Sequence, residues 1–105
     1  MSRSIIPGNA KEKCFVCQRY CHTEEHHIFG GPDRPNAEKY GLKVNLCTEH
    51  HRGTKGVHGR DGAQLAQYLH EVGQEAYEDR KMKYNGMTMA EARDQFRSEF
   101  RKSYL

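Results

Sequence analysis

Cys14-Phe15-Val16-Cys17 and, thirty residues further on, Cys47-Thr48-Glu49-His50 are the two stretches of sequence that decide this fold. In each stretch the metal-binding side chains stand three positions apart, so one tight turn can point both at the same ion. Three thiolates and one imidazole complete the tetrahedral ligand set of a structural zinc. We therefore expect Zn²⁺ to be held by Cys14, Cys17, Cys47 and His50. Such an ion contributes about 10 kcal/mol to folding, as much as the whole stability of a typical domain.

Two neighbouring residues compete for this ion. Cys21 follows Cys17 by four residues, and we interpret it as a spare core cysteine because the two pairs already supply four ligands. His51 can replace His50, but the two-residue spacing favours His50 and leaves His51 for other chemistry. Buried free cysteines beside a surface histidine are the simpler alternative. We disfavour that alternative because two such pairs of metal-binding residues, each with two residues between its members (zinc knuckles), rarely arise by chance.

Length and composition also favour a metal-stapled domain. The 105 residues include 35% hydrophobic and 30% charged residues and no Trp, which fits one domain with a small core. The formal net charge of +3 is compatible with a phosphate-rich partner and equally with an ordinary surface. No apolar run reaches the length of a membrane span, and residues 1–8 lack the apolar core of a signal peptide. We therefore expect a cytoplasmic protein that contacts no membrane and keeps its cysteines reduced.

The composition changes near Arg60, which divides the chain into a metal-rich part and a helical part. Residues 1–12 read as a disordered or loose N-terminal lead-in. Residues 13–60 hold all the cysteines, and we expect them to form short strands and loops organised by the metal. Residues 61–105 hold no cysteine and should form a helical extension that packs on this core.

The metal-rich part should contain two strands and a short helix. β-branched and aromatic residues favour a strand over residues 24–29, which a glycine turn then ends. Residues 42–46 are the second candidate strand. Residues 47–52 should then open a short helix that ends by Gly53.

The helical part shows apolar residues at helical spacing in two segments. The first segment predicts a helix over residues 62–80, with one apolar face made of Leu65, Tyr68, Leu69, Val72 and Ala76. Asn85-Gly86 breaks the chain, and Thr88 with Glu91 makes a capping box for a second helix. We interpret the second apolar stripe as core or as a partner face: Met89, Ala92, Phe96, Phe100 and Tyr104.

A second cluster of functional side chains surrounds His26-His27. Adjacent histidines on a strand point to opposite faces, unless a bulge turns them together. Such a pair next to acidic residues and before a glycine turn is unusual in a purely structural strand. Two other histidines, His22 and His70, we interpret as ordinary surface residues.

These motifs resemble those of HNH nucleases, the ββα-metal family, in their zinc-bearing treble-clef form. His26-His27-Ile28 followed by Cys47-x2-His50-His51 carries the resemblance, which covers residues 14–51. It implies an α+β fold in which a zinc-bound treble-clef ββα-metal core precedes two C-terminal helices. It also implies one divalent catalytic ion apart from the structural zinc. The whole chain is also similar to small HNH proteins of phages and prophages of Gram-positive bacteria, through residues 25–31, 39–42, 56–59 and 100–105.

The resemblance assigns roles to three histidines. His27 matches the general base that activates water, and His26 and His51 match the ligands of the catalytic ion. Mg²⁺ or Mn²⁺ is the expected ion, and imidazoles also suit Ni²⁺ or Zn²⁺. Glu24 or Glu25 can hydrogen-bond a histidine from behind.

This chain departs from the family pattern at one position. The family's middle Asn, which orients the base, falls on Leu42 here. Asn36 and Asn45 lie nearby in the sequence but out of register.

A glycine-rich loop follows the second zinc knuckle. Lys55, His58 and Arg60 in this loop, together with Arg52 before it, can grip phosphates through charge and backbone N–H groups. His58 can equally add a ligand to the catalytic ion. A flexible, solvated loop is an equally good interpretation of the same composition.

We predict a metal-dependent HNH endonuclease that hydrolyses phosphodiester bonds of DNA in phage DNA metabolism, with RNA as the other substrate left open. The alternative function is a non-catalytic zinc-binding module that holds nucleic acid or protein. In either case the C-terminal helix can dock the domain onto phage replication, recombination or packaging proteins.

Overall fold

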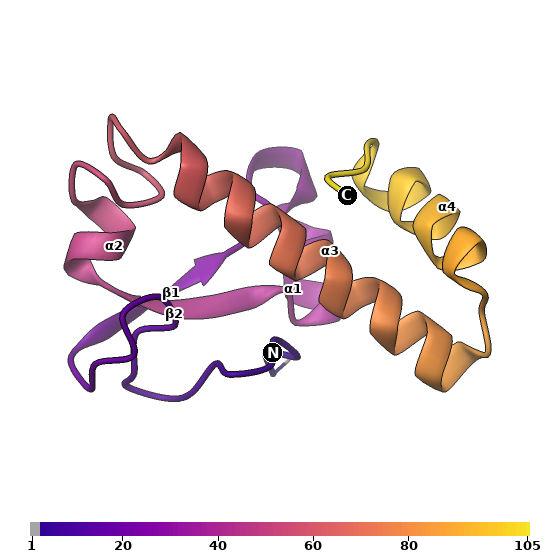
Figure 1. Cartoon of the computed structure of the whole chain (residues 1–105), viewed down its shortest axis with the longest axis horizontal. Coiled ribbons are helices and arrows are strands. Elements are labelled where there is room, and N and C mark those ends of the chain that lie inside the picture. Colours follow the sequence, from indigo (N-terminus) through magenta and orange to yellow (C-terminus); the bar gives the residue numbers. More distant parts are fainter. Residues whose placement is uncertain (1–2) are drawn as a thin grey trace.

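The computed structural model describes residues 3–105 and has an α+β fold with a small two-stranded sheet and helices (Figure 1). Its elements are β1 (Thr23–His27), the 3-10 helix η1 (Gly31–Asp33), α1 (Arg34–Tyr40), β2 (Lys43–Cys47), α2 (Thr48–Arg52), α3 (Ala63–Asn85) and α4 (Met89–Phe100). The long helix α3 runs diagonally across the molecule, and α4 packs against it after a turn. No helix within residues 3–105 is both long and apolar enough to cross a membrane.

The sheet is an antiparallel hairpin whose connection is η1 and α1. Thr23 lies opposite Cys47, and His27 lies opposite Lys43. Both strands lie within two residues of the predicted bounds. The free edge of β2 is covered by the N-terminal segment, because the N–H of Phe15 donates to the backbone oxygen of Asn45 at 2.8 Å. This cover removes unpaired strand edge from solvent.

The N-terminal segment is docked, whereas we expected residues 1–12 to be loose. Ile6 is 4% exposed and belongs to the hydrophobic core. The side-chain oxygen of Asn9 accepts a hydrogen bond from the N–H of Asn45 in β2 at 2.8 Å. The expectation is therefore wrong for these residues, since the buried side chain of Ile6 and the hydrogen bond of Asn9 hold the segment against the rest of the protein. Residues 1 and 2 lie outside the described part of the chain.

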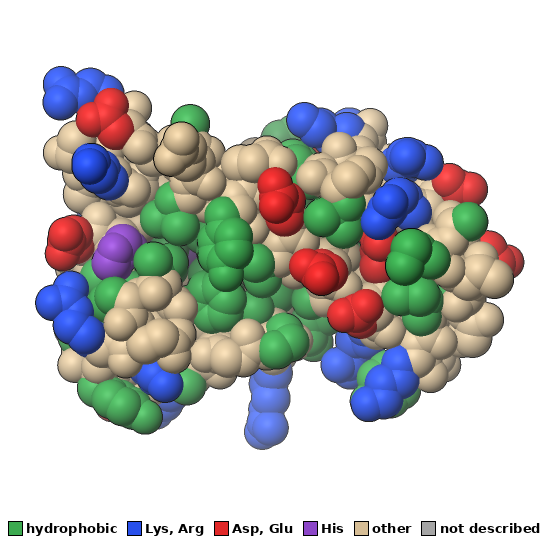
Figure 2. Space-filling view, viewed as in Figure 1, with side chains coloured by type: hydrophobic (Ala, Val, Ile, Leu, Met, Phe, Trp, Pro, Cys, Tyr) green, Lys and Arg blue, Asp and Glu red, His purple; other side chains and the backbone are tan. Residues whose placement is uncertain are grey.

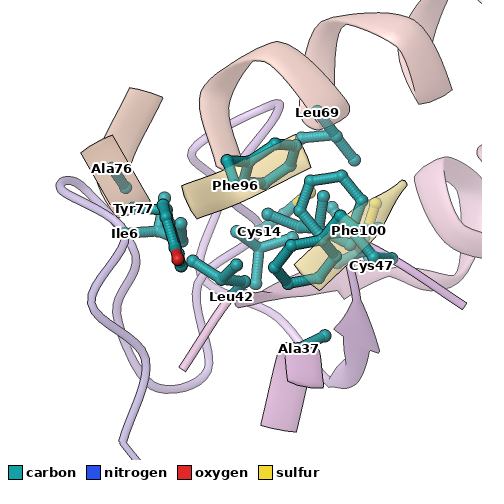
Figure 3. Close-up of a cluster of buried hydrophobic side chains, with 14 residues drawn as sticks. Ile6, Cys14, Ala37, Leu42, Cys47, Leu69, Ala76, Tyr77, Phe96 and Phe100 are labelled. Atoms are coloured by element: carbon teal, nitrogen blue, oxygen red, sulfur yellow. The ribbon is translucent and has the colours of Figure 1, made fainter. Parts of the chain in front are cut away.

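One hydrophobic core joins the metal-rich and helical parts of the chain (Figure 3). The ring of Phe29, which follows β1, lies 4.8 Å from that of Phe100 and 5.5 Å from that of Phe96. Leu69 and Tyr77 of α3 are buried in the same cluster. Of the predicted α4 stripe, Ala92, Phe96 and Phe100 are buried, whereas Met89 at the first turn is 58% exposed.

Both long helices were predicted, but α3 ends later than expected. It reaches Asn85 rather than residue 80, because no helix-breaking residue precedes Gly86, which adopts a φ of 66° at the C-cap. The capping box at the start of α4 is confirmed. Thr88 accepts from the N–H of Glu91, and the Glu91 carboxylate accepts from the N–H of Thr88.

Helix α1 was not predicted, although its ends carry ordinary helix signals. Pro35 occupies the first turn, and Gly41 ends the helix in the left-handed conformation with a φ of 71°. The helix has only seven residues, too few for an apolar period to be recognised. It is nevertheless important for the site, since it carries Glu38 and Arg34.

A half-buried carboxylate ties α4 to α1 and α3. Glu99 accepts hydrogen bonds from the phenols of Tyr40 in α1 and Tyr77 in α3, the latter at 2.5 Å. Burial would raise the pKa of the Glu99 carboxyl, but the two phenols outweigh it and hold that pKa below 4.5. Burial and the carboxylate together raise the pKa of Tyr40 to about 12.

Glu99→Gln should therefore destabilise the fold in a pH-dependent way. A carboxylate with a depressed pKa contributes stability above pH 4.5, and that stability is lost as the pH falls through the folded-state pKa. We expect the variant to lose about 2 kcal/mol of unfolding free energy at pH 7 and less at pH 3. Urea unfolding of both proteins at both pH values measures this difference. An unchanged difference at pH 3 would contradict the assignment.

Candidate functional site

Four side chains that the sequence predicts as zinc ligands come together in one group. One ligand atom from each of Cys14, Cys17, Cys47 and His50 lies within 4.8 Å of all the others. The Nδ1 atom of His50 is 3.2 Å from the Sγ of Cys47 and 3.7 Å from the Sγ of Cys14. All the cysteines are free of disulfides. This group can hold a metal ion, and its donor set is compatible with structural zinc.

The first knuckle is preformed by its own backbone. The N–H of Gln18 donates to the oxygen of Cys14 at 2.8 Å, which closes the turn between the two cysteines. A hydrogen bond from the Arg19 side chain, 3.4 Å from the sulfur, lowers the pKa of Cys17 to about 6. The thiolate that metals require is therefore favoured at neutral pH. Cys21 lies outside the ligand group, with its sulfur 3.5 Å from the Arg19 oxygen.

A second group consists of three imidazoles, which we call the histidine trio: His26 of β1, His51 of α2 and His58 of the following loop. Their ligand atoms lie within 4.8 Å of one another, and their ring centroids are 4.7 to 5.3 Å apart. Of the predicted ligands of a catalytic ion, His26 and His51 are thus brought together. His58, which we considered either as a phosphate contact or as a third ligand, lies in the ligand position.

A carboxylate behind the trio fixes one of its rings. The Nδ1 atom of His51 lies 2.9 Å from Oε1 of Glu24, which leaves Nε2 for a ligand. The other oxygen of Glu24 pairs with Arg52 at 2.9 Å. The hydrogen bond with His51 is the main reason why the pKa of Glu24 is lowered. Carboxylate–histidine pairs of this kind orient metal ligands in proteins. Of the two candidates for this role, Glu24 and Glu25, Glu24 is the one that contacts a histidine of the trio.

Burial favours the neutral form of two imidazoles of the trio, His26 and His58. Burial, reinforced by the neighbouring His51, lowers the pKa of His26 to about 4. Burial also lowers the pKa of His58. Neutral imidazoles present the lone pairs that divalent cations bind. These two members of the trio can therefore present lone pairs to a cation at neutral pH.

Backbone hydrogen bonds hold His58 over α2. The N–H of Val57 donates to the oxygen of His50 at 2.9 Å, and the N–H of His58 donates to that of His51 at 3.0 Å. The loop can fold this closely because Gly59 has no side chain: a Cβ there would lie 1.9 Å from the oxygen of Gly53.

Gly59→Ala should therefore remove His58 from the trio while leaving the zinc group intact. We expect the added methyl to push the loop away from α2 and to weaken Mn²⁺ binding about 10-fold or more, the effect of losing a supporting contact at a metal site. Isothermal titration calorimetry of the zinc-loaded protein measures the affinity. Gly30→Ala is the control, since a Cβ at Gly30 meets nothing within 4 Å. Equal affinity of the Gly59 variant and wild type would disprove the role of the loop.

His27 is not a member of the trio, although it lines the same pocket as His26 and His51. Consecutive residues of β1 alternate between faces, and no bulge turns His27 toward His26. The Nε2 atom of His27 instead lies 2.8 Å from Oε1 of Glu38 in α1. Glu25, His27 and Glu38 form a third group of potential ligands.

A buried lysine occupies the centre of that third group. The Nζ atom of Lys43 lies 3.1 Å from both oxygens of Glu38 and 3.5 Å from Oε2 of Glu25. Its side chain is only 3% exposed. The ammonium group already supplies the positive charge that two carboxylates attract. This group is therefore built as an ion-pair cluster that supports His27 rather than as a second metal site.

The trio and His27 meet at one open pocket of about 480 Å³. Arg34 of α1 and His70 of α3 also line it. The interpretation of His70 as a surface residue is wrong: its ring stacks on Phe29 at 5.2 Å and lies 4.5 Å from the ring of Tyr104. Burial there lowers the pKa of His70. The histidine trio and His27 can therefore contact one molecule bound in this pocket.

The predicted phosphate contacts lie around α2 and its loop. Lys55 is exposed, Arg60 is 85% exposed beside Asp61, and Arg52 is 65% exposed while it pairs with Glu24. Sequence reasoning missed Arg34, Glu38 and Lys43. No local pattern marks these three, because only the packing of α1 on the sheet brings them to His27.

Comparison of the chain with protein-family models, with curated proteins and with solved structures yields no match. The geometry and chemistry of the site therefore carry the functional argument.

Proposed function

We propose that this chain is a metal-dependent nuclease that hydrolyses phosphodiester bonds of DNA. The observation that carries the proposal is the histidine trio, oriented by Glu24, beside the His27–Glu38 pair at one open pocket. A divalent cation at the trio, Mg²⁺ or Mn²⁺, with Ni²⁺ or Zn²⁺ also suited to imidazoles, would neutralise phosphate charge and stabilise the leaving 3′ oxygen.

In this proposal His27 is the general base. A neutral imidazole at the pocket accepts a proton from the attacking water, and Glu38 orients the ring and stabilises the imidazolium that forms. Glu38 thereby takes over the bracing role of the Asn that the HNH pattern places at Leu42. Neither nearby asparagine is available for this role. The side chain of Asn36 donates a hydrogen bond to the backbone oxygen of Glu99, and that of Asn45 donates to the backbone oxygen of Ala10.

The cysteine knuckle, the β1–β2 hairpin and α2 are, in this proposal, a zinc-stapled treble clef that holds the trio. What supports it is continuity along the chain. Cys47 and His50 of the zinc group bracket the start of α2, and His51 of the trio is the next residue. A zinc ion at the first group would thus fix the position of the second. Arg34 lines the pocket and can attract a phosphate group there. Lys55 is an exposed cation in the loop that carries His58.

Plasmid nicking tests the proposal. Zinc-loaded wild type with Mn²⁺ or Mg²⁺ should convert supercoiled DNA to the open circle, and His27→Ala should slow this by about 10² to 10⁴, the usual worth of a general base. Zinc content and melting temperature should be equal in both proteins. If wild type leaves DNA intact but binds it, the chain is a non-catalytic binding module; if both cut equally, His27 is not the base.

A further inference from the structure

A second pocket lies away from the histidine trio, between α1, the C-terminal half of α3 and the N-terminal segment. Its volume is about 540 Å³. Four cationic residues line it: Arg3, Lys39, Arg80 and Lys81. No Asp or Glu is found among its lining residues within the described chain. Figure 2 shows Lys and Arg side chains at the lower edge of the view as well as elsewhere around the molecule.

Much of this positive charge is not neutralised by the protein. Arg3, Arg80 and Lys81 form no ion pair with any residue between 3 and 105. Glu99 interacts electrostatically with Lys81 without forming an ion pair, and its carboxylate accepts hydrogen bonds from the phenols of Tyr40 and Tyr77. A concave site with several cations and one shielded carboxylate attracts anions.

The pocket is also pre-organised. The ammonium of Lys81 lies 5.2 Å from the ring centre of Tyr40 and 5.5 Å from that of Tyr77, both of which line the pocket. The N-terminal wall is held in place because the N–H of Ile5 donates to the oxygen of Gly41 at 2.9 Å. A Cβ at Gly41 would lie 2.1 Å from the oxygen of Arg3, so this contact needs glycine.

Helix α1 connects the two pockets. Arg34 at its start lines the pocket of the histidine trio, and Lys39 at its end lines the basic pocket. Five residues of helix span about 8 Å, the axial rise of about two base-pair steps of DNA. Both pockets therefore border the same short helix.

We propose that the basic pocket binds phosphate groups, and that they belong to the nucleic-acid strand that the histidine trio also contacts. The choice of strand rests on the proposed function, whereas phosphate binding rests on the pocket alone. The shared ligand chemistry is the phosphate group. A free polyphosphate is the other source that the experiment must separate.

The test combines Arg80→Glu with Lys81→Glu in the full, zinc-loaded chain without added Mg²⁺ or Mn²⁺. Fluorescence anisotropy with a labelled 20-nucleotide DNA, single-stranded and duplex, measures binding, and calorimetry with pyrophosphate tests the free ligand. We expect DNA affinity to fall at least about tenfold near 0.1 M salt, and the slope of log K against log salt to lose about 1 to 2. Zinc content and melting temperature should stay at wild-type values.

The matched control combines Lys83→Glu with Arg97→Glu, two exposed cations that do not line the pocket and change the net charge equally. DNA affinity should fall far less in this control. Equal losses in the two double variants, or no loss in the pocket variant together with no pyrophosphate binding by wild type, would overturn the proposal. If the pocket variant loses pyrophosphate binding but binds DNA as wild type does, the pocket is a phosphate site whose ligand is not a nucleic-acid strand. Pocket-dependent DNA binding without nicking leaves this inference standing and contradicts only the nuclease.

Discussion

Cys14→Ser is expected to leave the chain largely unfolded at neutral pH and 25 °C. Cys14 is fully buried, and its sulfur belongs both to the zinc group and to the hydrophobic core. Serine offers no thiolate, so a tetrahedral zinc loses one of its four ligands. Structural zinc contributes on the order of 10 kcal/mol, whereas the whole stability of a domain is about 5 to 15 kcal/mol. Few other single changes in this chain remove so large a fraction of its stability.

Cys21→Ser is the matched control, because Cys21 is half-buried, lies four residues beyond Cys17 and stands outside the ligand group. Purified wild type and this control should each carry one zinc per chain and show the same cooperative melting by circular dichroism. Cys14→Ser should carry none and show no transition. A Cys14 variant that keeps its zinc and melts at the wild-type temperature would mean that Cys21 or another residue is the true ligand.

The zinc group could be predicted from the sequence because its geometry is local. Two residues between Cys14 and Cys17 make one turn, and the knuckle before His50 opens a helix in the same way. The capping box of Thr88 is local for the same reason. The one long-range feature to be predicted was that the two Cys/His pairs lie together, and the four ligands that a tetrahedral zinc requires imply this.

The histidine site was only half predictable, because its members meet through tertiary packing. Strand alternation accounts for the separation of His26 from His27, but it does not say which partners each of them meets. His58 reaches the trio through a loop that folds back on α2, and Glu38 reaches His27 from a helix with no apolar period. Such contacts depend on where whole elements pack, which no spacing in the sequence encodes.

The histidine trio gives the second large effect: His51→Ala should abolish divalent-metal binding at the trio and DNA nicking with it. His51 is the best-fixed member, since Glu24 holds its Nδ1 atom at 2.9 Å and α2 fixes its backbone. Removing a partner that orients a ligand typically costs 10- to 100-fold in metal affinity, so Glu24→Gln should weaken Mn²⁺ binding by about that factor. Removal of the ligand itself should exceed about 100-fold.

His51→Ala, Glu24→Gln and a control variant should show graded Mn²⁺ affinities, which a purely structural role of the histidine trio would not produce. His22→Ala deletes an exposed imidazole that belongs to none of the three groups of potential ligands, so its Mn²⁺ affinity and nicking rate should equal those of wild type. All three variants should keep one zinc per chain and the wild-type melting temperature. If His51→Ala lost activity only because it unfolds, zinc and melting temperature would fall with it. If affinity instead followed the order of the series while both stayed constant, the trio would be the site of the catalytic ion, because only groups that touch or orient it change its binding in that order.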